Sequence, residues 1–278
     1  MGSKPSTLSI QFCSDLHLEF YSNYIDIPKD IILPSSPILA LLGDIGLPFE
    51  IDENGVQVYE QFLLEQADNF EKVLVIAGNH EYYDRKHTME EIEAEIKRIC
   101  AIKGDKLLFL NNSSIIIDNV RILGSTLWTN IPEEEALMIM YRYNDYRLIY
   151  ISKSLDETEK YYKYEPISTS DTNQLHKEAI AFIENEINLF KKNKERAIIV
   201  LSHYSPTFKN ASNKDNLTTF ADATNLEHLY CKNMYWLYGH THFNYKQKIG
   251  GATLISNQRG YVGKQLVDNY KNNLTLKL

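Results

Sequence analysis

The sequence has little of several features that would each assign a chain to a class of protein. Its 278 residues contain three cysteines, Cys13, Cys100 and Cys231. Their number is odd and too small for a disulfide framework, which makes a reducing compartment the simpler expectation. No charged segment followed by an apolar core opens the chain, and no apolar run is long enough to cross a bilayer. We therefore expect a cytoplasmic protein with no membrane partner.

Basic residues are also in deficit. Lysine and arginine number 29 against 37 aspartates and glutamates, and the formal net charge is −8. A protein that coats nucleic acid needs many cations on phosphates, so an extended nucleic-acid partner is not expected. A small nucleotide is still compatible with this balance, because the charge of a bound metal can locally outweigh the field of the whole protein.

Strand and helix patterns alternate along the chain. Apolar runs at residues 8–13, 38–42, 73–77, 197–201 and 235–238 are typical of strands that are buried on both faces. Helical patterns run from Tyr59 to Phe70, from a capping box at Thr88 and Glu91, and from a start at Asp171 and Gln174. The alternation predicts α/β layering. No repeat or linker divides the chain, so we expect a single domain over residues 1–278.

A second sheet with antiparallel character is predicted from three other stretches. Residues 115–123 are typical of a hairpin that turns at Asp118-Asn119, and residues 244–256 are typical of a pair that turns at Gly250-Gly251. The tail 274–278 alternates like a closing strand. Both sheets would then contain parallel and antiparallel strands.

Residues 129–170 are crowded with tyrosine and mixed charge. We interpret them as a helical insertion whose tyrosines pack by their rings and keep their hydroxyls in water. The functional alternative is a lid that stacks on an aromatic group of a substrate.

Five short pieces combine aspartate, asparagine and histidine directly after apolar runs. They are Asp15-Leu16-His17, Gly43-Asp44, Gly78-Asn79-His80-Glu81, Ser202-His203 and Gly239-His240-Thr241-His242. The carboxyl ends of strands in an open α/β sheet meet at one edge, where ligands bind. Carboxylate, amide and imidazole together suit Mn²⁺, Fe²⁺ or Zn²⁺, and the absence of cysteine argues against a structural zinc site. His87, His176 and His228 lie outside the pattern and are expected to be structural.

The five pieces, in this order, resemble the signature of the calcineurin-like metallophosphoesterase superfamily: D-x-H, G-D, G-N-H-[DE], H and G-H-x-H. The stretches Asn144–Arg147 and Asn257–Tyr261 are also similar to those of bacterial-type members. The resemblance spans residues 8 to about 262. It implies a four-layer fold in which two mixed sheets pack as a sandwich flanked by helices.

The resemblance also implies roles for individual residues. Asp15, His17 and His242 would hold one divalent metal, and Asn79, His203 and His240 a second. Asp44 would bridge the two ions. A shared hydroxide would attack phosphorus in line with the leaving oxygen. His80 would be the general acid or charge stabiliser at the leaving group. Asn79, His80 and Arg259 are the residues expected to contact the substrate, although a salt bridge explains Arg259 equally well.

Two departures from the family pattern stand out. Members with G-D-x-x-D use the second aspartate to orient the acid histidine, but Leu47 occupies that position here. We expect another carboxylate, Asp84 or Glu81, to orient His80, on proximity in sequence alone. Gln258 stands where the family usually has proline.

The predicted function is hydrolysis of a small phosphomonoester or phosphodiester by two metal ions. A lid would favour a nucleotide or cyclic nucleotide as the substrate. The alternatives are a nuclease, which would need a basic track beside the site, and a catalytically silent scaffold, which typically lacks one of the ligands. The sequence leaves the oligomeric state open.

Overall fold

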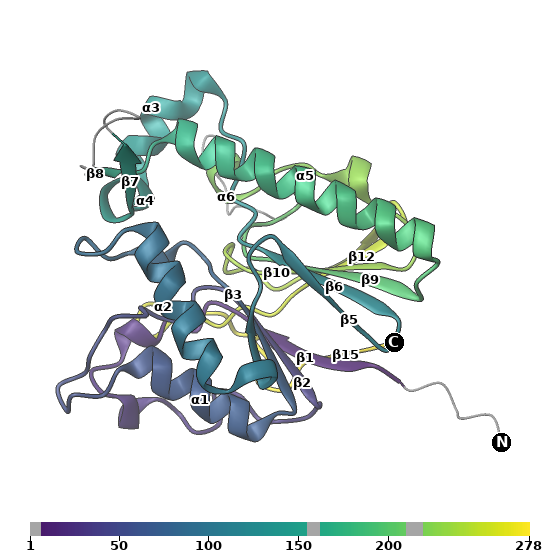
Figure 1. The fold of residues 1–278 in the computed structure, drawn as a ribbon, viewed down its shortest axis with the longest axis horizontal. Coiled ribbons are helices and arrows are strands. Elements are labelled where there is room, and N and C mark those ends of the chain that lie inside the picture. The colour runs from purple at the N-terminus through teal and green to yellow at the C-terminus, as the bar shows by residue number, and fades with distance from the viewer. Residues whose placement is uncertain (1–6, 155–161, 210–218) are drawn as a thin grey trace.

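The computed structural model describes residues 7–154, 162–209 and 219–278 of the chain. Two large β-sheets pack face to face, and helices cover the outer side of each sheet (Figure 1). The order of layers is therefore helices, sheet, sheet, helices. This is the predicted α/β architecture of two mixed sheets between helical layers, and the prediction is confirmed.

The first sheet has the strand order β15-β1-β2-β3-β4. Its central strands are parallel, and β15 pairs antiparallel with β1 through Ile10 and Leu276. The predicted runs at residues 8–13, 38–42 and 73–77 form β1, β2 and β3, and the predicted closing strand forms β15. The strand bounds are β1 Ser9–Cys13, β2 Ile38–Leu42, β3 Lys72–Ile76, β4 Leu107–Phe109 and β15 Thr275–Lys277.

The second sheet has the order β11-β12-β10-β9-β6-β5, with parallel central strands and an antiparallel hairpin at each end. Asp118 and Asn119 form the predicted β5–β6 turn with φ of 50° and 59°, as a type I′ turn requires. The other hairpin turns at Gly250-Gly251, as expected. The strand bounds are β5 Ser113–Ile117, β6 Val120–Ser125, β9 Ala197–Ser202, β10 Met234–Tyr238, β11 Lys246–Ile249 and β12 Ala252–Ser256.

Two helices cover the first sheet, α1 (Val58–Asn69) and α2 (Met89–Ile102), and α5 (Thr169–Asn193) covers the second (Figure 1). Thr88 and Glu91 form the predicted capping box of α2. The predicted start of α5 at Asp171 was wrong, because Ser168 is the N-cap and Asp171 completes its capping box. None of the helices in the described ranges combines the length and apolar character needed to span a bilayer.

The remaining elements are short. A two-stranded ribbon joins β13 (Gly260–Tyr261) to β14 (Gln265–Leu266), and α6 (Thr219–Asp222) follows β9. The single-turn 3₁₀ helices are η1 Leu18–Phe20, η2 Tyr24–Asp26, η3 His80–Tyr82, η4 Gly104–Lys106 and η5 Glu227–Leu229.

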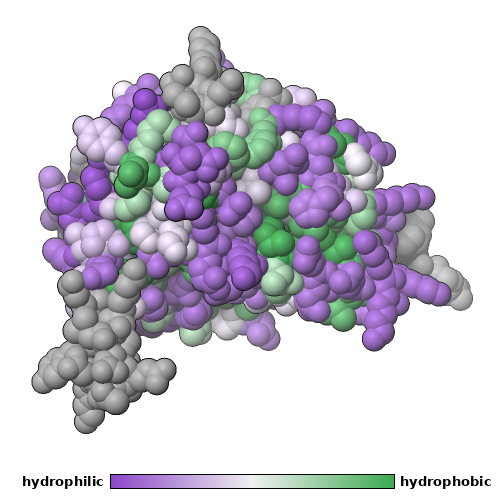
Figure 2. Space-filling view, turned by 90° about the horizontal axis from the view of Figure 1, so that it is seen from above, coloured by the Kyte–Doolittle hydropathy of each residue, from purple (hydrophilic) through white to green (hydrophobic). Residues whose placement is uncertain are grey.

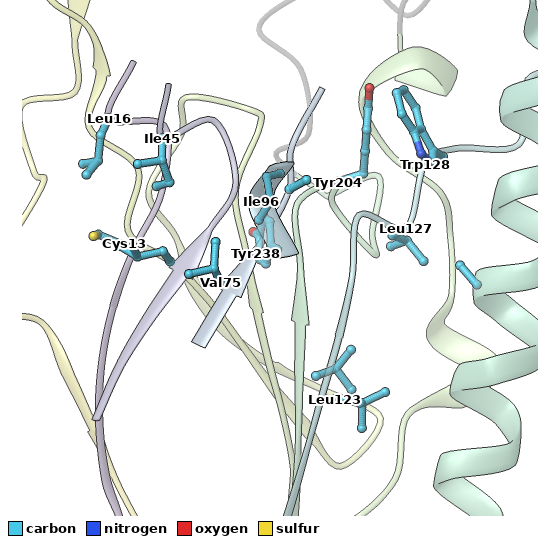
Figure 3. Packing of buried hydrophobic residues seen from close by; sticks show 14 of the residues in the cluster. Cys13, Leu16, Ile45, Val75, Ile96, Leu123, Leu127, Trp128, Tyr204 and Tyr238 are labelled. Carbon is cyan, nitrogen blue, oxygen red and sulfur yellow. The ribbon is translucent and has the colours of Figure 1, made fainter. Parts of the chain in front are cut away.

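The central strands are buried on both faces because alternate residues enter different apolar layers. In β2, Ile38, Ala40 and Leu42 pack between the sheets, whereas Leu39 and Leu41 pack toward the helices. Figure 3 shows residues of the apolar cluster to which Leu39 and Leu41 belong, among them Cys13 and Val75 from the first sheet and Leu123 from the second. Viewed from above Figure 1, hydrophilic residues cover most of the surface and hydrophobic ones form small separate groups (Figure 2). The sandwich therefore provides a rigid frame for the loops at the strand ends.

Residues 129–170 are helical only in their first half. They form α3 (Glu133–Arg142) and α4 (Asp145–Leu148), and then an antiparallel hairpin of β7 (Tyr150–Ser154) and β8 (Tyr162–Pro166). The prediction of a helical insertion was therefore wrong for the second half. Residues 155–161 of this segment lie outside the described residues.

A buried ion-pair group ties β6 to the far end of α5. The Arg121 guanidinium donates to Glu186 at 2.7 Å and to Glu195 at 2.8 and 2.6 Å, and all three side chains are less than 10% exposed. Arg121→Met would leave two buried carboxylates without their cation. We expect it to lower the free energy of unfolding by about 3 kcal/mol, as measured by urea denaturation.

The matched control for this prediction is Arg98→Met, which removes ion pairs with Glu60 and Glu95 from a side chain that is 50% exposed. We expect it to lower the free energy of unfolding by less than about 1 kcal/mol, because solvent screens surface ion pairs. An equal fall in the free energy of unfolding for both substitutions would show that the buried Arg121 ion pairs stabilise the fold no more than an exposed pair does.

Candidate metal centre

The five sequence pieces meet at one edge of the sandwich, after the carboxyl ends of β1, β2, β3, β9 and β10. Two groups of predicted ligands form there, one of Asp15, His17 and His242 and the other of Asp44, His203 and His240. A third group, His17, Glu19 and His80, shares His17 with the first. In each group the potential ligand atoms lie within 4.8 Å of one another.

The first group is compact. His242 Nε2 lies 3.2 Å from His17 Nε2 and 3.3 Å from Asp15 Oδ1. Asp15 and His17 are fully buried, and only the His242 side chain is partly exposed, at 9%. Three predicted ligands therefore face one point.

The second group has the same character. His203 Nε2 lies 3.3 Å from Asp44 Oδ1, 3.3 Å from His240 Nδ1 and 3.1 Å from Asn79 Oδ1. The other Asp44 oxygen, Oδ2, lies 3.7 Å from His17 Nε2 in the first group. Asp44 thus stands between the groups, which is the position predicted for a bridging carboxylate.

The chemistry of the donor atoms fits a pair of divalent cations. His17 Nδ1 lies 3.0 Å from the Glu19 carboxylate, and His203 Nδ1 lies 2.9 Å from the Leu42 carbonyl oxygen. Because both oxygens only accept, each Nδ1 carries a proton, which leaves each Nε2 as the atom that would bind a cation. A hydrogen bond at the outer nitrogen is typical of histidines that bind metal through the inner one.

Most of the predicted ligands have an unusual backbone conformation. Asp15, His17, Asp44, His240 and His242 have φ between 49° and 70°, the left-handed region that residues with a Cβ seldom adopt. Such strain persists only where the surrounding structure imposes it, and it gathers at functional sites. The strained loops turn these side chains back over the strand ends.

Two of the glycines that precede predicted ligands allow the loops to approach one another. A Cβ on Gly78 would lie 2.7 Å from His203 Cε1, and one on Gly239 would lie 2.7 Å from Ser14 Oγ. Both distances are shorter than real Cβ contacts, so any larger residue would push the two sheets' loops apart.

Glu81 fastens two of the loops from within. Its carboxylate is fully buried and accepts hydrogen bonds from the backbone N–H groups of Gly78 at 2.7 Å, Asp44 at 2.9 Å and Ile45 at 2.8 Å. The glutamate of the G-N-H-E piece therefore holds the loop after β2 against the loop after β3. It cannot orient His80, so that part of the sequence prediction was wrong.

The other candidate for orienting His80, Asp84, was also wrong, because it pairs with His87 at 2.8 Å. Glu19 takes this role instead: its Oε1 lies 2.9 Å from His80 Nδ1. Burial opposes the ionised form of Glu19, but hydrogen bonds from His17 and His80 outweigh it and lower the pKa of Glu19 to about 2. The signal in the sequence was the position of Glu19, two residues after His17.

The environment of His80 favours its charged form. Burial alone would lower the pKa of His80, but the negative charges of Asp44 and Glu19 raise that pKa to about 9 in the protein without metal. Its backbone N–H donates to Asp44 Oδ1 at 2.9 Å, and its Nε2 lies 3.3 Å from the Tyr261 hydroxyl.

Asp145 belongs to the family-like stretch Asn144–Arg147, but sequence reasoning gave it no role. It lies in α4 and is 3% exposed. One oxygen accepts from Asn79 Nδ2 at 2.9 Å and from the Tyr83 hydroxyl at 2.5 Å, and the other from the Tyr204 hydroxyl at 3.2 Å. This carboxylate fixes the Asn79 amide so that its oxygen faces His203.

The outcomes for the remaining predicted residues differ. Arg259 is buried, donates to the Tyr21 hydroxyl at 2.6 Å and does not line the cavity described below, so the structure does not bring it to the site. Gln258, which stands where the family usually has proline, holds the G-H-T-H loop. Its amide oxygen accepts from the backbone N–H of His242, and its amide N–H₂ donates to the Thr241 hydroxyl. His176 is buried against two carbonyl oxygens, as a structural histidine should be.

A cavity of about 590 Å³ opens over both groups. Its floor includes Asp44, Asn79, His80, His240 and His242. The insertion contributes Arg142 and Tyr143 to its walls, and the ribbon of β13 and β14 contributes Tyr261 and Lys264. The rings of Phe20 and Tyr83 come from the segments after β1 and β3. This volume admits a ligand of the size of a nucleotide.

Comparison with known proteins places this geometry in a family. A family profile described as "Calcineurin-like phosphoesterase" matches residues 8–244. The curated protein "Uncharacterized protein L509" of Acanthamoeba polyphaga mimivirus is 29% identical over 282 residues, with 91% of each chain covered. The phosphopantetheinyl hydrolase PptH from Mycobacterium tuberculosis has a similar fold, with a TM-score of 0.63 at 16% identity, over 93% of this chain and 91% of that one. The profile covers most of the sequence, and the chain belongs to the calcineurin-like phosphoesterase family.

Proposed function

We propose that this chain is a metal-dependent phosphoesterase with two metal ions, which hydrolyses a small phosphomonoester or phosphodiester. Membership of the family supports the coarser part, a metal-dependent phosphoester hydrolase. The observation that carries the finer part is the position of Asp44 between two groups of donor atoms on the floor of one cavity.

Asp15, His17 and His242 would hold one ion, Asn79, His203 and His240 the other, and Asp44 both. Paired divalent cations supply a nucleophile from water near neutral pH and neutralise the phosphate oxygens. The protein's own contribution would be to hold the seven side chains with their ligand atoms close together.

His80 is the group that handles the proton of the leaving oxygen. Its side chain is 12% exposed and it lines the cavity beside Asp44 and Asn79. A protonated Nε2 donates to the leaving oxygen as the bond to phosphorus breaks. Asn79 lines the cavity floor in addition to offering a ligand oxygen, which supports the proposal that it contacts the substrate.

The walls of the cavity favour a substrate with a planar ring and a second negative charge. Lys264 Nζ lies 4.9 Å above the Phe20 ring, and Arg142 reaches the same cavity from α3. Aromatic rings stack on a base, and the cations attract an anionic group beyond the reacting phosphate. A nucleotide meets both conditions. Two cations do not make a basic track, so the nuclease alternative has no support from the cavity lining.

The experiment is a panel of phosphate esters assayed with Mn²⁺, Fe²⁺ or Zn²⁺ against a chelator-treated control. The panel contains nucleoside monophosphates, a cyclic nucleotide, a phosphopantetheinyl compound, phosphoserine and a single-stranded oligonucleotide. We expect turnover of a nucleotide at least about tenfold above phosphoserine, an effect of roughly one favourable contact. No hydrolysis of any ester, with two metals bound, would support the silent scaffold instead.

A further inference from the structure

We infer that Glu19 is a positioning residue that links the first metal group to the leaving-group acid. This inference rests on the proposed function. A single Glu19 oxygen, Oε1, lies 3.0 Å from His17 Nδ1 and 2.9 Å from His80 Nδ1. The two imidazole rings meet edge to face with their centroids 4.5 Å apart. One carboxylate therefore holds both rings.

The direction of each hydrogen bond follows from chemistry. An ionised carboxylate only accepts, so both Nδ1 atoms are protonated. His17 then presents a bare Nε2 to the first metal group, and His80 presents Nε2 to the cavity. With Nδ1 protonated, any proton that His80 gives to the leaving oxygen must be the one on Nε2.

Because Glu19 is buried, its carboxylate depends on the hydrogen bonds from the two histidines. The Glu19 side chain is 9% exposed, and among the described residues its second oxygen, Oε2, has no hydrogen-bond partner. A buried carboxylate oxygen without a partner costs free energy, and the bonds to the two histidines offset that cost. A glutamine of the same shape would place an amide N–H₂ there instead, and would remove the charge that both rings face.

The position of Glu19 also explains how the chain functions without the second aspartate of G-D-x-x-D. Leu47 occupies that place, and Glu19 approaches His80 from the loop after β1 instead. Because Glu19 belongs to the same short helix-turn as His17, a shift of the first metal group would move the acid with it.

The test compares two substrates that differ in their need for a proton. p-Nitrophenolate leaves without help, whereas the more basic phenolate gains from protonation. With Mn²⁺ bound, Glu19→Gln should lower kcat for phenyl phosphate about tenfold more than for p-nitrophenyl phosphate. Glu50→Gln is the matched control. Glu50 and Glu19 line a second cavity, of about 390 Å³, which does not include any of the predicted metal ligands. We expect Glu50→Gln to change neither rate.

A double-mutant cycle separates the two rings that Glu19 contacts. If Glu19 acts through His80, Glu19→Gln should lower kcat for phenyl phosphate less in a His80→Ala background than in the native one, because groups that act as a unit are not additive. Any loss that remains, together with a fall in bound Mn²⁺, is the part that Glu19 exerts through His17. An equal loss of kcat in both backgrounds would show that Glu19 does not act through His80 and would overturn the inference.

A readout without metal or turnover keeps the inference testable if the proposed function fails. In protein with ¹⁵N-labelled histidine, the hydrogen-bonded Nδ1–H protons of His17 and His80 should give two downfield NMR signals. Glu19→Gln should shift or remove both, and Glu50→Gln should leave both in place. Persistence of both signals in a folded Glu19→Gln protein would show that this carboxylate does not hold the rings.

Discussion

Asp44→Asn is expected to reduce the bound metal from two ions per chain to one or none and to lower kcat about a thousandfold. The substitution keeps the shape of the side chain but replaces one anionic oxygen by an N–H₂ group. Since Oδ1 faces His203 and Oδ2 faces His17, no orientation of the amide can serve both groups.

The charge is as important as the geometry. Burial opposes ionisation of Asp44, but the positive charges of His203 and His80 hold its pKa well below the usual range. The side chain is therefore an anion wherever the protein is folded at neutral pH. Its neutral replacement would leave too little negative charge for two dications.

Metal content by elemental analysis and kcat on the best ester of the panel check this prediction. Asp84→Asn is the control, because Asp84 pairs with His87 outside the two groups. Two ions per chain in the Asp44→Asn protein would contradict the bridging role, even if activity were lost.

Asp145→Asn should have the second largest effect, a loss of about a hundredfold in affinity for the second metal ion. The native carboxylate accepts hydrogen bonds from Asn79, Tyr83 and Tyr204. An asparagine is neutral and has one accepting oxygen. With that oxygen toward Asn79 its N–H₂ group faces the Tyr204 hydroxyl, and with the N–H₂ group toward Asn79 two amide donors oppose each other. In either orientation the Asn79 amide is held less firmly than by the native carboxylate. Asn79 would then be free to turn its oxygen away from His203.

Metal titration followed by calorimetry would separate the two ions, since Asp145 touches only the second group. Tyr204→Phe is the graded control: it removes one hydrogen bond of 3.2 Å and should cost less than about threefold. Equal weakening of both metal sites in Asp145→Asn would indicate a general loss of structure rather than a turned amide.

The sequence predicted the sheets well because buried parallel strands leave a strong pattern. The run at residues 38–42 is fully buried, and the run at 73–77 corresponds to β3 with an offset of one residue. The Asp118-Asn119 turn was equally predictable, because few residue pairs tolerate two left-handed conformations in succession.

The hairpin of β7 and β8 was missed for a physical reason. Tyr150–Ser154 and Tyr162–Pro166 contain tyrosine, lysine and serine rather than a clear apolar face, so neither a period of two nor one of 3.6 dominates. The start of α5 was misplaced because both Ser168 and Asp171 are good caps, and only the fold decides between them.

That the proposed ligands gather at one edge could be predicted because each of them follows a strand, but the residues that contact and orient them could not. Asp145 is 66 residues from Asn79, and Glu19 is 61 residues from His80. Only the packing of the loops brings these pairs together. Proximity in sequence favoured Glu81, which instead accepts three backbone hydrogen bonds that a sequence does not reveal.

The division of the ligands between the two sheets has a mechanical consequence. Asp15, His17, Asp44 and Asn79 follow strands of one sheet, and His203, His240 and His242 follow strands of the other. Each donor group combines residues from both sheets, so neither sheet alone supplies a complete group. Metal binding would hold the two sheets together and raise the melting temperature of the chain, more so the more tightly the ions bind. A rise in melting temperature on addition of metal would therefore report the same event as the metal affinity measured by titration.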